Sequence, residues 1–107
     1  MKGNEMPAEV FLLKQPIQHQ ARLSVLFEKL SDHGQISNRE QFKKLTRELW
    51  EFKAFQIRMP CYFRPDRRVV VTHGFIKKKD RVDKQELTRA EAIRNEYERS
   101  LIQRGKG

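Results

Sequence analysis

The spacing of the apolar residues changes near Thr46, and this change predicts a fold that combines helices with a sheet. Between Gln15 and Leu30 the large apolar residues recur three and four positions apart, as they do on one face of an amphipathic helix. From Trp50 to Ala54 they alternate with charged residues, as in a strand with one buried face. We therefore expect an α+β protein.

Two helices at the start of the chain are expected to form a hairpin. The first covers about residues 15–30 and ends near Gly34, because glycine readily adopts the left-handed conformation that follows a helix. A capping pattern that begins at Ser37 or Asn38 predicts a second, short helix that reaches Leu45. Together they have the order of an αα-hairpin.

Three strands and a last helix are expected to follow, which gives the order ααβββα. The strands are predicted over residues 50–54, 57–63 and 68–75. Arg64–Arg67 carries proline at the position that a type I turn favours. A helix over residues 85–103 completes the order. We expect the helical hairpin to pack on one face of this small antiparallel sheet.

The whole chain of 107 residues is expected to form one domain with an ordinary hydrophobic core. Residues 1–9 are polar and are predicted to be frayed. The last helix has two candidate N-caps, namely Asp83 followed by Glu86 and Thr88 followed by Glu91. We expect no linker that would divide the chain into separate domains.

The chain is strongly basic, and the excess charge is concentrated. It has 23 Lys and Arg against 14 Asp and Glu, which gives a net charge of +9. Between Arg64 and Lys84 there are eight Lys or Arg against three Asp, a local +5. Such a stripe indicates a partner with a phosphate backbone. Charge alone leaves an anionic membrane surface or an acidic protein open as alternatives.

Cysteine content and hydropathy restrict the compartment. Cys61 is the only cysteine, so neither a disulfide within the chain nor a cysteine-based zinc site is expected. No apolar run is long enough to predict a membrane-spanning helix, and the N-terminus lacks the apolar region of a secretory signal. We expect a cytoplasmic protein with no metal and no cofactor.

Three motifs follow one another through the predicted strands. Leu49–Glu51 begins the first strand, Arg58 lies on the second ahead of Cys61–Phe63, and His73–Lys78 follows the third. An alanine-containing helix comes next, with Ala90. In these motifs and their spacing the chain resembles the phage-derived, HigB-like branch of the RelE/ParE superfamily, the toxins of type II toxin–antitoxin systems. The three motifs together indicate this family more specifically than any one of them does alone.

The resemblance covers about residues 8–98 and carries several implications. It implies a fold like that of microbial ribonucleases, and cleavage of messenger RNA inside the ribosomal A site without a metal, which blocks translation. It also implies a cognate antitoxin, expected to be a small helix-turn-helix protein, in a toxin–antitoxin hetero-oligomer. A ParE-like toxin that binds DNA gyrase and a non-enzymatic RNA-binding module stay open as alternatives.

Metal-free RNA cleavage needs a base, an acid and cations around the phosphate. Arg58 can grip two phosphate oxygens, and His73 has the pKa range of a proton shuttle. Glu51 is a candidate base, or else an ion-pair partner of Lys53 or Arg58. The predicted catalytic residues are Arg58, His73, Lys78, Glu51 and Tyr62. The predicted RNA-binding residues are Lys53, Lys77, Lys79, Arg81, Arg67 and Arg68.

Two positions depart from the pattern of the family. Lys79–Asp83 stands where many relatives carry a Thr-Pro pair before the last helix. Lys84 stands near the position where RelE carries a tyrosine. These departures leave the identity of the general acid and base open.

Overall fold

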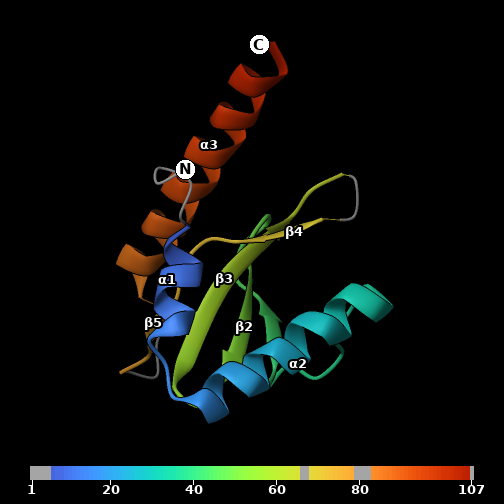
Figure 1. Cartoon of the computed structure of the whole chain (residues 1–107), viewed down its shortest axis with the longest axis vertical. Coiled ribbons are helices and arrows are strands. Elements are labelled where there is room, and N and C mark those ends of the chain that lie inside the picture. The colour runs from blue at the N-terminus through green and yellow to red at the C-terminus, as the bar shows by residue number, and fades with distance from the viewer. Residues whose placement is uncertain (1–5, 66–67, 79–82, 107) are drawn as a thin grey trace.

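The computed structural model describes residues 6–65, 68–78 and 83–106. Three helices and five strands lie in this part of the chain, which confirms the predicted α+β class (Figure 1). The elements are α1 Pro7–Leu13, α2 Ile17–His33, β1 Phe42–Lys44, β2 Trp50–Ala54, β3 Ile57–Phe63, β4 Val69–Val71, β5 Phe75–Ile76 and α3 Lys84–Lys106.

The five strands form one antiparallel sheet in the order β1-β2-β3-β4, and β5 pairs with β3. The single strand predicted over residues 68–75 is therefore two short strands, β4 and β5, which both pair with β3. The interruption falls at Thr72–Gly74, where the Thr72 hydroxyl donates to the backbone oxygen of Pro60 at 3.2 Å. Both Thr72 and His73 are buried, so the connection between β4 and β5 packs against the sheet.

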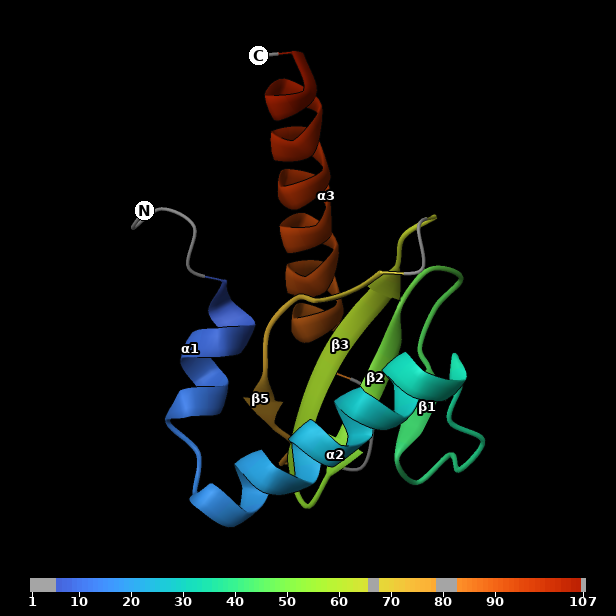
Figure 2. The same ribbon diagram turned by 45° about the vertical axis from the view of Figure 1, so that its right-hand side comes forward.

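One face of the sheet is covered by α2, which lies across the strands in both ribbon views (Figures 1 and 2). Leu23, Leu26 and Leu30 recur on the buried side of this helix, as the apolar spacing predicts. They pack against the strand residues whose side chains point the same way, such as Phe52 and Met59. This contact is the main hydrophobic core.

The opposite face is covered only in part, by α3. Leu87, Ala90 and Tyr97 of this helix pack with Tyr62 in a second, smaller cluster. Its other three members belong to the sheet and its connections, namely Leu45, Leu49 and Val70. The C-terminal half of α3 extends beyond the sheet (Figure 2). The end of this face that lies near β5 is thus left open to solvent.

The prediction of a second helix in the hairpin is wrong, because residues 42–44 form the strand β1. Asn38 makes a single turn instead of a helix: its side-chain oxygen accepts from the backbone N–H of Glu40 at 2.8 Å. The chain then pairs with β2, and Phe42 stacks on Trp50 with ring centroids 5.1 Å apart. This aromatic packing stabilises a strand where the local capping pattern favours a helix.

The frayed start predicted for residues 1–9 is wrong from Pro7 onward, where α1 begins with proline in its first turn. Ala8 is buried. The Phe11 ring lies so close to Gly74 that a Cβ atom added at Gly74 would be 2.2 Å from Phe11 Cδ2. Gly74 therefore permits the close approach of α1. The first five residues lie outside the described part of the chain.

Two predicted helix ends are confirmed. Gly34 follows α2 in the left-handed conformation with φ 76°. Asp83 caps α3, because its carboxylate accepts from the backbone N–H of Gln85 at 2.9 Å. The predicted turn at Arg64–Arg67 falls partly outside the described residues. Within those residues, no helix is both long enough and apolar enough to cross a membrane.

Candidate functional site

Charged side chains gather on the open face of the sheet, opposite α2. In β2, Glu51 and Lys53 alternate with buried apolar residues, so both point away from the main core. The register places Lys43 opposite Glu51 and Arg58 opposite Lys53. Lys77 follows β5 and adds a fourth cation close enough to act on the carboxylate. We call these five residues the Glu51 cluster.

A cavity of about 910 Å³ borders this cluster: Glu51, Lys43 and Lys77 line it, whereas Lys53 and Arg58 lie beside it. Its walls include Glu51, Lys43 and Pro60 from the sheet and Phe75 and Lys78 from the segment after it. The opposite wall is the start of α3, from Asp83 to Leu87. The sheet and the first turns of α3 thus enclose a hollow that is lined with cations and has a carboxylate at its base.

Glu51 is 6% exposed, which is unusual for a carboxylate. Burial raises the pKa of Glu51 above its ordinary value, and the positive charges of Arg58, Lys43, Lys77 and Lys53 oppose this rise. The nearest of these cations is Arg58, whose Nε lies 3.9 Å from Glu51 Oε2. A carboxylate in this environment accepts a proton more readily than one at the surface.

Arg58 is held by the backbone of the turn beside it. Its Nη1 donates to the backbone oxygens of Phe55 and Ile57, both at 2.9 Å. Its Nε is buried and has no hydrogen-bond partner among the described residues. The Nη1 side of the guanidinium is therefore fixed by the backbone, and the charge of the group is held beside Glu51.

Lys53 lies beside Arg58 in a crowded cationic environment. Partial burial lowers the pKa of Lys53, and the charges of Arg58 and Lys43 lower it further. An anion bound among these side chains would relieve this repulsion. The electrostatics of the cluster therefore favour a phosphate group.

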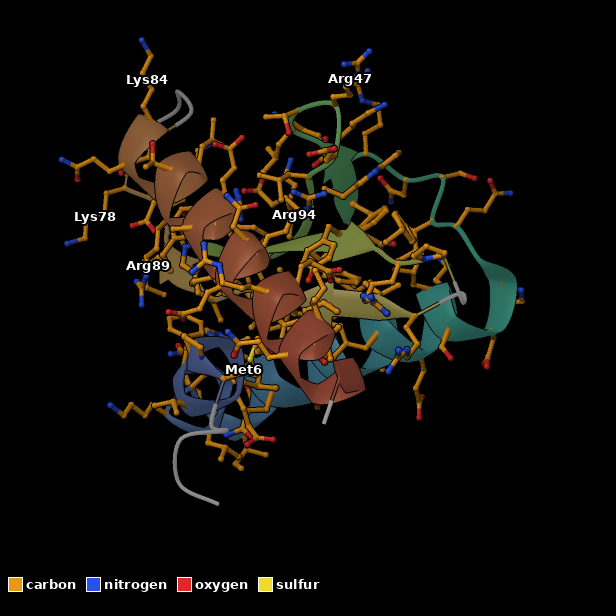
Figure 3. All side chains as sticks on the ribbon, turned by 90° about the horizontal axis from the view of Figure 1, so that it is seen from above. Met6, Arg47, Lys78, Lys84, Arg89 and Arg94 are labelled. Carbon is orange, nitrogen blue, oxygen red and sulfur yellow. The ribbon has the colours of Figure 1, made fainter. Side chains whose placement is uncertain are left out.

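Lys78, Lys84 and Arg89 extend the positive surface along one side of the molecule, around the start of α3 (Figure 3). Lys78 and Lys84 also line the cavity. Lys79 and Arg81 were predicted for the same surface, but they lie outside the described residues, as does Arg67. Arg68 lies elsewhere, beside β4 and the last turn of α2.

His73 does not line the cavity, although it was predicted as a proton shuttle. It is 1% exposed, and its Nε2 lies 2.8 Å from Glu86 Oε1 while its Nδ1 lies 3.0 Å from Thr72 Oγ1. Burial lowers the pKa of His73, and the hydrogen bond to Glu86 opposes this shift. The Nε2 atom of the ring can donate to Glu86, which links the sheet to the first turn of α3.

Tyr62 also lies away from the cavity, under the middle of α3. Its hydroxyl donates to Glu98 Oε2 at 2.7 Å, and the Arg94 guanidinium lies 5.3 Å from the centre of its ring. Burial, together with the bond to Glu98, raises the pKa of Tyr62 well above its usual range. The structure therefore brings together Glu51, Lys53, Arg58, Lys77 and Lys78, and leaves His73, Tyr62 and Arg68 apart.

Lys43 is the residue of the Glu51 cluster that sequence reasoning missed. It was overlooked because residues 38–45 were expected to be helical. Residues 42–45 read Phe-Lys-Lys-Leu, a spacing of three between apolar residues that favours a helix, so no local signal identifies Lys43 as a strand residue. Among the described residues, no group of three or more His, Cys, Asp or Glu side chains is placed to hold a metal ion.

A search of curated proteins found no match to the chain. The family model described as "Phage derived protein Gp49-like (DUF891)" matches residues 10–95, which include the whole sheet and the first half of α3. These are the elements that build the cavity and the Glu51 cluster. The chain therefore belongs to the Gp49-like family, a RelE/toxin-like family that is associated with the toxins of toxin–antitoxin systems.

Proposed function

We propose that this chain is the toxin of a toxin–antitoxin pair and cleaves messenger RNA on the ribosome. The observation that carries the proposal is the Glu51 cluster, in which a buried carboxylate is influenced by four cations, two of which, Lys43 and Lys77, line a cavity together with it. The membership of a RelE/toxin-like family supports the same reading. Both the charge and the shape of the cavity fit a single strand of RNA.

The chemistry that fits this site is attack of a ribose 2′-oxygen on the adjacent phosphate. Glu51 takes the proton of the 2′-hydroxyl, and its raised pKa makes it a stronger base than a surface carboxylate. Arg58 and Lys43 stabilise the negative charge that grows on the phosphate oxygens. Lys78 donates a proton to the leaving 5′-oxygen. The products are a 2′,3′-cyclic phosphate and a free 5′-hydroxyl.

His73 and Tyr62 take supporting roles in this proposal. Each ring is buried and bonded to a glutamate of α3, His73 to Glu86 and Tyr62 to Glu98. They hold the helix that forms one wall of the cavity. We assign them the positioning of α3 rather than proton transfer.

An antitoxin is the partner that the family implies. A protein that blocks the cavity would neutralise the toxin by keeping RNA from the Glu51 cluster. With a net charge of +9, the chain favours an acidic antitoxin segment at this surface. The small helix-turn-helix protein predicted as the antitoxin would supply such a segment.

The test is cleavage of a reporter messenger RNA in a reconstituted translation mixture, with cut sites mapped by primer extension. The wild type should cut within translated codons and leave cyclic phosphate ends. Arg58→Ala combined with Lys78→Ala should slow cleavage at least about 100-fold, the scale for losing groups that stabilise charge in the transition state. Lys29→Ala, a change at an exposed cation on α2, is the matched control and should leave the rate unchanged.

A folded double variant that cleaves as fast as the wild type would overturn the site. Intact messenger RNA together with trapped gyrase–DNA complexes would instead favour a ParE-like toxin. A second candidate function, non-enzymatic RNA binding, is favoured by the position of His73 and Tyr62 outside the cavity. It predicts that translation stops while messenger RNA and ribosomal RNA both stay intact.

A further inference from the structure

Phe55 occupies a position that the backbone makes unfavourable for it. It begins the two-residue turn between β2 and β3 and has φ 58°, the only positive φ of a non-glycine residue in the described part of the chain. A bulky side chain rarely adopts this conformation, which glycine and asparagine accept readily. Phe55 is also 58% exposed. Neither the turn nor core packing accounts for an aromatic residue here.

The ring of Phe55 is supported from one side. It stacks on His19 of α2, with ring centroids 4.1 Å apart and planes at 20°. Because more than half of the residue stays exposed, this contact leaves room for a second flat group against the ring. The pair of rings forms a small, oriented aromatic platform at the end of the sheet.

This platform adjoins the Glu51 cluster. The backbone oxygen of Phe55 accepts the hydrogen bond from Arg58 Nη1 at 2.9 Å, so the same turn carries the ring and holds the guanidinium. Lys53 pairs with Arg58 across the two strands that lead into the turn. The ring lies toward α2 and the guanidinium lies on the opposite face, so an RNA strand that contacts both passes around the turn at the end of the sheet.

We propose that Phe55 stacks on an unpaired base of the RNA strand whose phosphate binds at Arg58. The inference rests on the proposed function and adds a base subsite to it. Proteins that bind single-stranded RNA combine a basic groove for the backbone with aromatic side chains for the bases. The unfavourable backbone and the exposed ring are then both explained by a ligand that covers the ring.

Phe55→Asn tests the proposal, since asparagine accepts the left-handed conformation and keeps the turn. Binding is measured by fluorescence anisotropy with a short, labelled single-stranded oligoribonucleotide of mixed sequence. Loss of one stacked base should weaken binding by about 5- to 100-fold. The dependence of binding on salt should not change, because no charge is altered, and the melting temperature should not fall.

Tryptophan substitutions give a direct readout of stacking. Phe55→Trp should keep the affinity of the wild type, and the emission of the new indole should be quenched by the oligoribonucleotide. Phe63 provides the matched control, since it is also exposed but lies at the other end of β3. Phe63→Trp should show no quenching, and Phe63→Leu should bind RNA like the wild type.

The outcomes separate this inference from the proposed function. Unchanged RNA affinity in a folded Phe55→Asn variant overturns the base subsite alone, while the wild type still binds. A variant that loses affinity for the antitoxin but not for RNA also overturns it, because Phe55 would then be a protein contact. A wild type that binds no single-stranded RNA overturns the proposed function and the subsite together.

Discussion

Glu51 combines features that normally exclude one another, namely an ionisable side chain, deep burial and proximity to several cations. The cations Arg58, Lys43, Lys77 and Lys53 each favour its charged form, yet burial has the larger effect on its pKa. The net result is a pKa of Glu51 above its ordinary value. A base in an RNA-cleaving site needs that property.

Glu51→Gln should therefore change how stability depends on pH. Because the pKa of Glu51 is raised on folding, the folded state binds its proton more tightly than the unfolded state does. The wild type should lose free energy of unfolding as pH rises from 4.5 through the raised pKa, and Glu51→Gln should lack this loss. Urea unfolding at several pH values measures it.

The matched control for this prediction is Glu96→Gln, a change at an exposed position of α3. This variant should follow the wild-type pH profile. Glu51→Gln should also lose RNA cleavage while it keeps RNA binding. Identical pH profiles for Glu51→Gln and the wild type would contradict the shift in pKa that we assign to burial.

Much of the Glu51 cluster could be predicted from sequence. The alternation in residues 50–54 places Glu51 and Lys53 on one face, and the structure confirms this. The fate of His73 and Tyr62 could not be predicted in the same way. Whether a strand residue lies in a cavity or under a helix depends on where α3 crosses the sheet, and no local pattern contains that information.

At the scale of elements, α3 is attached to the sheet by polar contacts as well as by packing. Glu98 accepts from Arg64 Nε at 2.8 Å, from Arg64 Nη2 at 3.1 Å and from the Tyr62 hydroxyl at 2.7 Å. These bonds, first those from Arg64, lower the pKa of Glu98 to about 2. This attachment lies beyond the first turns of α3, which line the cavity.

Glu98→Gln should weaken the attachment in a pH-dependent way. Since the pKa of Glu98 is depressed on folding, its contribution to stability is present above pH 4.5 and is lost as pH falls toward about 2. The variant should be less stable than the wild type by about 1 kcal/mol at neutral pH, because the group is partly exposed. Thermal unfolding between pH 7 and acid should show the two curves converging.

Glu91→Gln, at an exposed position of the same helix, should be neutral in this experiment. A constant difference between Glu98→Gln and the wild type at all pH values would mean that the carboxylate charge plays no part. The prediction concerns stability only. RNA cleavage by Glu98→Gln should fall no more than the folded fraction does.

Element prediction succeeded where one periodicity dominates and failed where short segments compete. The helix α2 and the strands β2 and β3 have long, regular apolar patterns, and all three were predicted within a few residues. Residues 38–45 carry helix-capping signals, but Phe42 gains more by packing on Trp50 and Phe52 in the sheet. Tertiary contacts of this kind override local preference.

At the scale of the whole molecule, the net charge is +9, and the Glu51 cluster gathers four cations on the face of the sheet opposite α2. Removing cations from the Glu51 cluster should reduce the salt dependence of RNA binding, because each phosphate contact releases counterions. For Lys43→Ala combined with Lys77→Ala, the slope of log K against log salt should shrink by about 1.4. Titration of an oligoribonucleotide at several salt concentrations gives this slope.

A double change on the other face provides the control. Arg22→Ala combined with Lys29→Ala removes two exposed cations from α2, which covers the opposite side of the sheet. Its salt slope should match that of the wild type. Equal losses of slope in both double variants would show that RNA contacts the molecule without preference for the cavity.

Both edges of the sheet are formed by short strands. On one side the last strand is β1, with three residues, and two of them are Lys43 and Lys44. On the other side β3 is flanked by β4 and β5, which have three and two residues. Short or lysine-bearing edges offer few free backbone groups for a second copy to pair with. The fold can thus accumulate in a cell without joining its sheets edge to edge into aggregates.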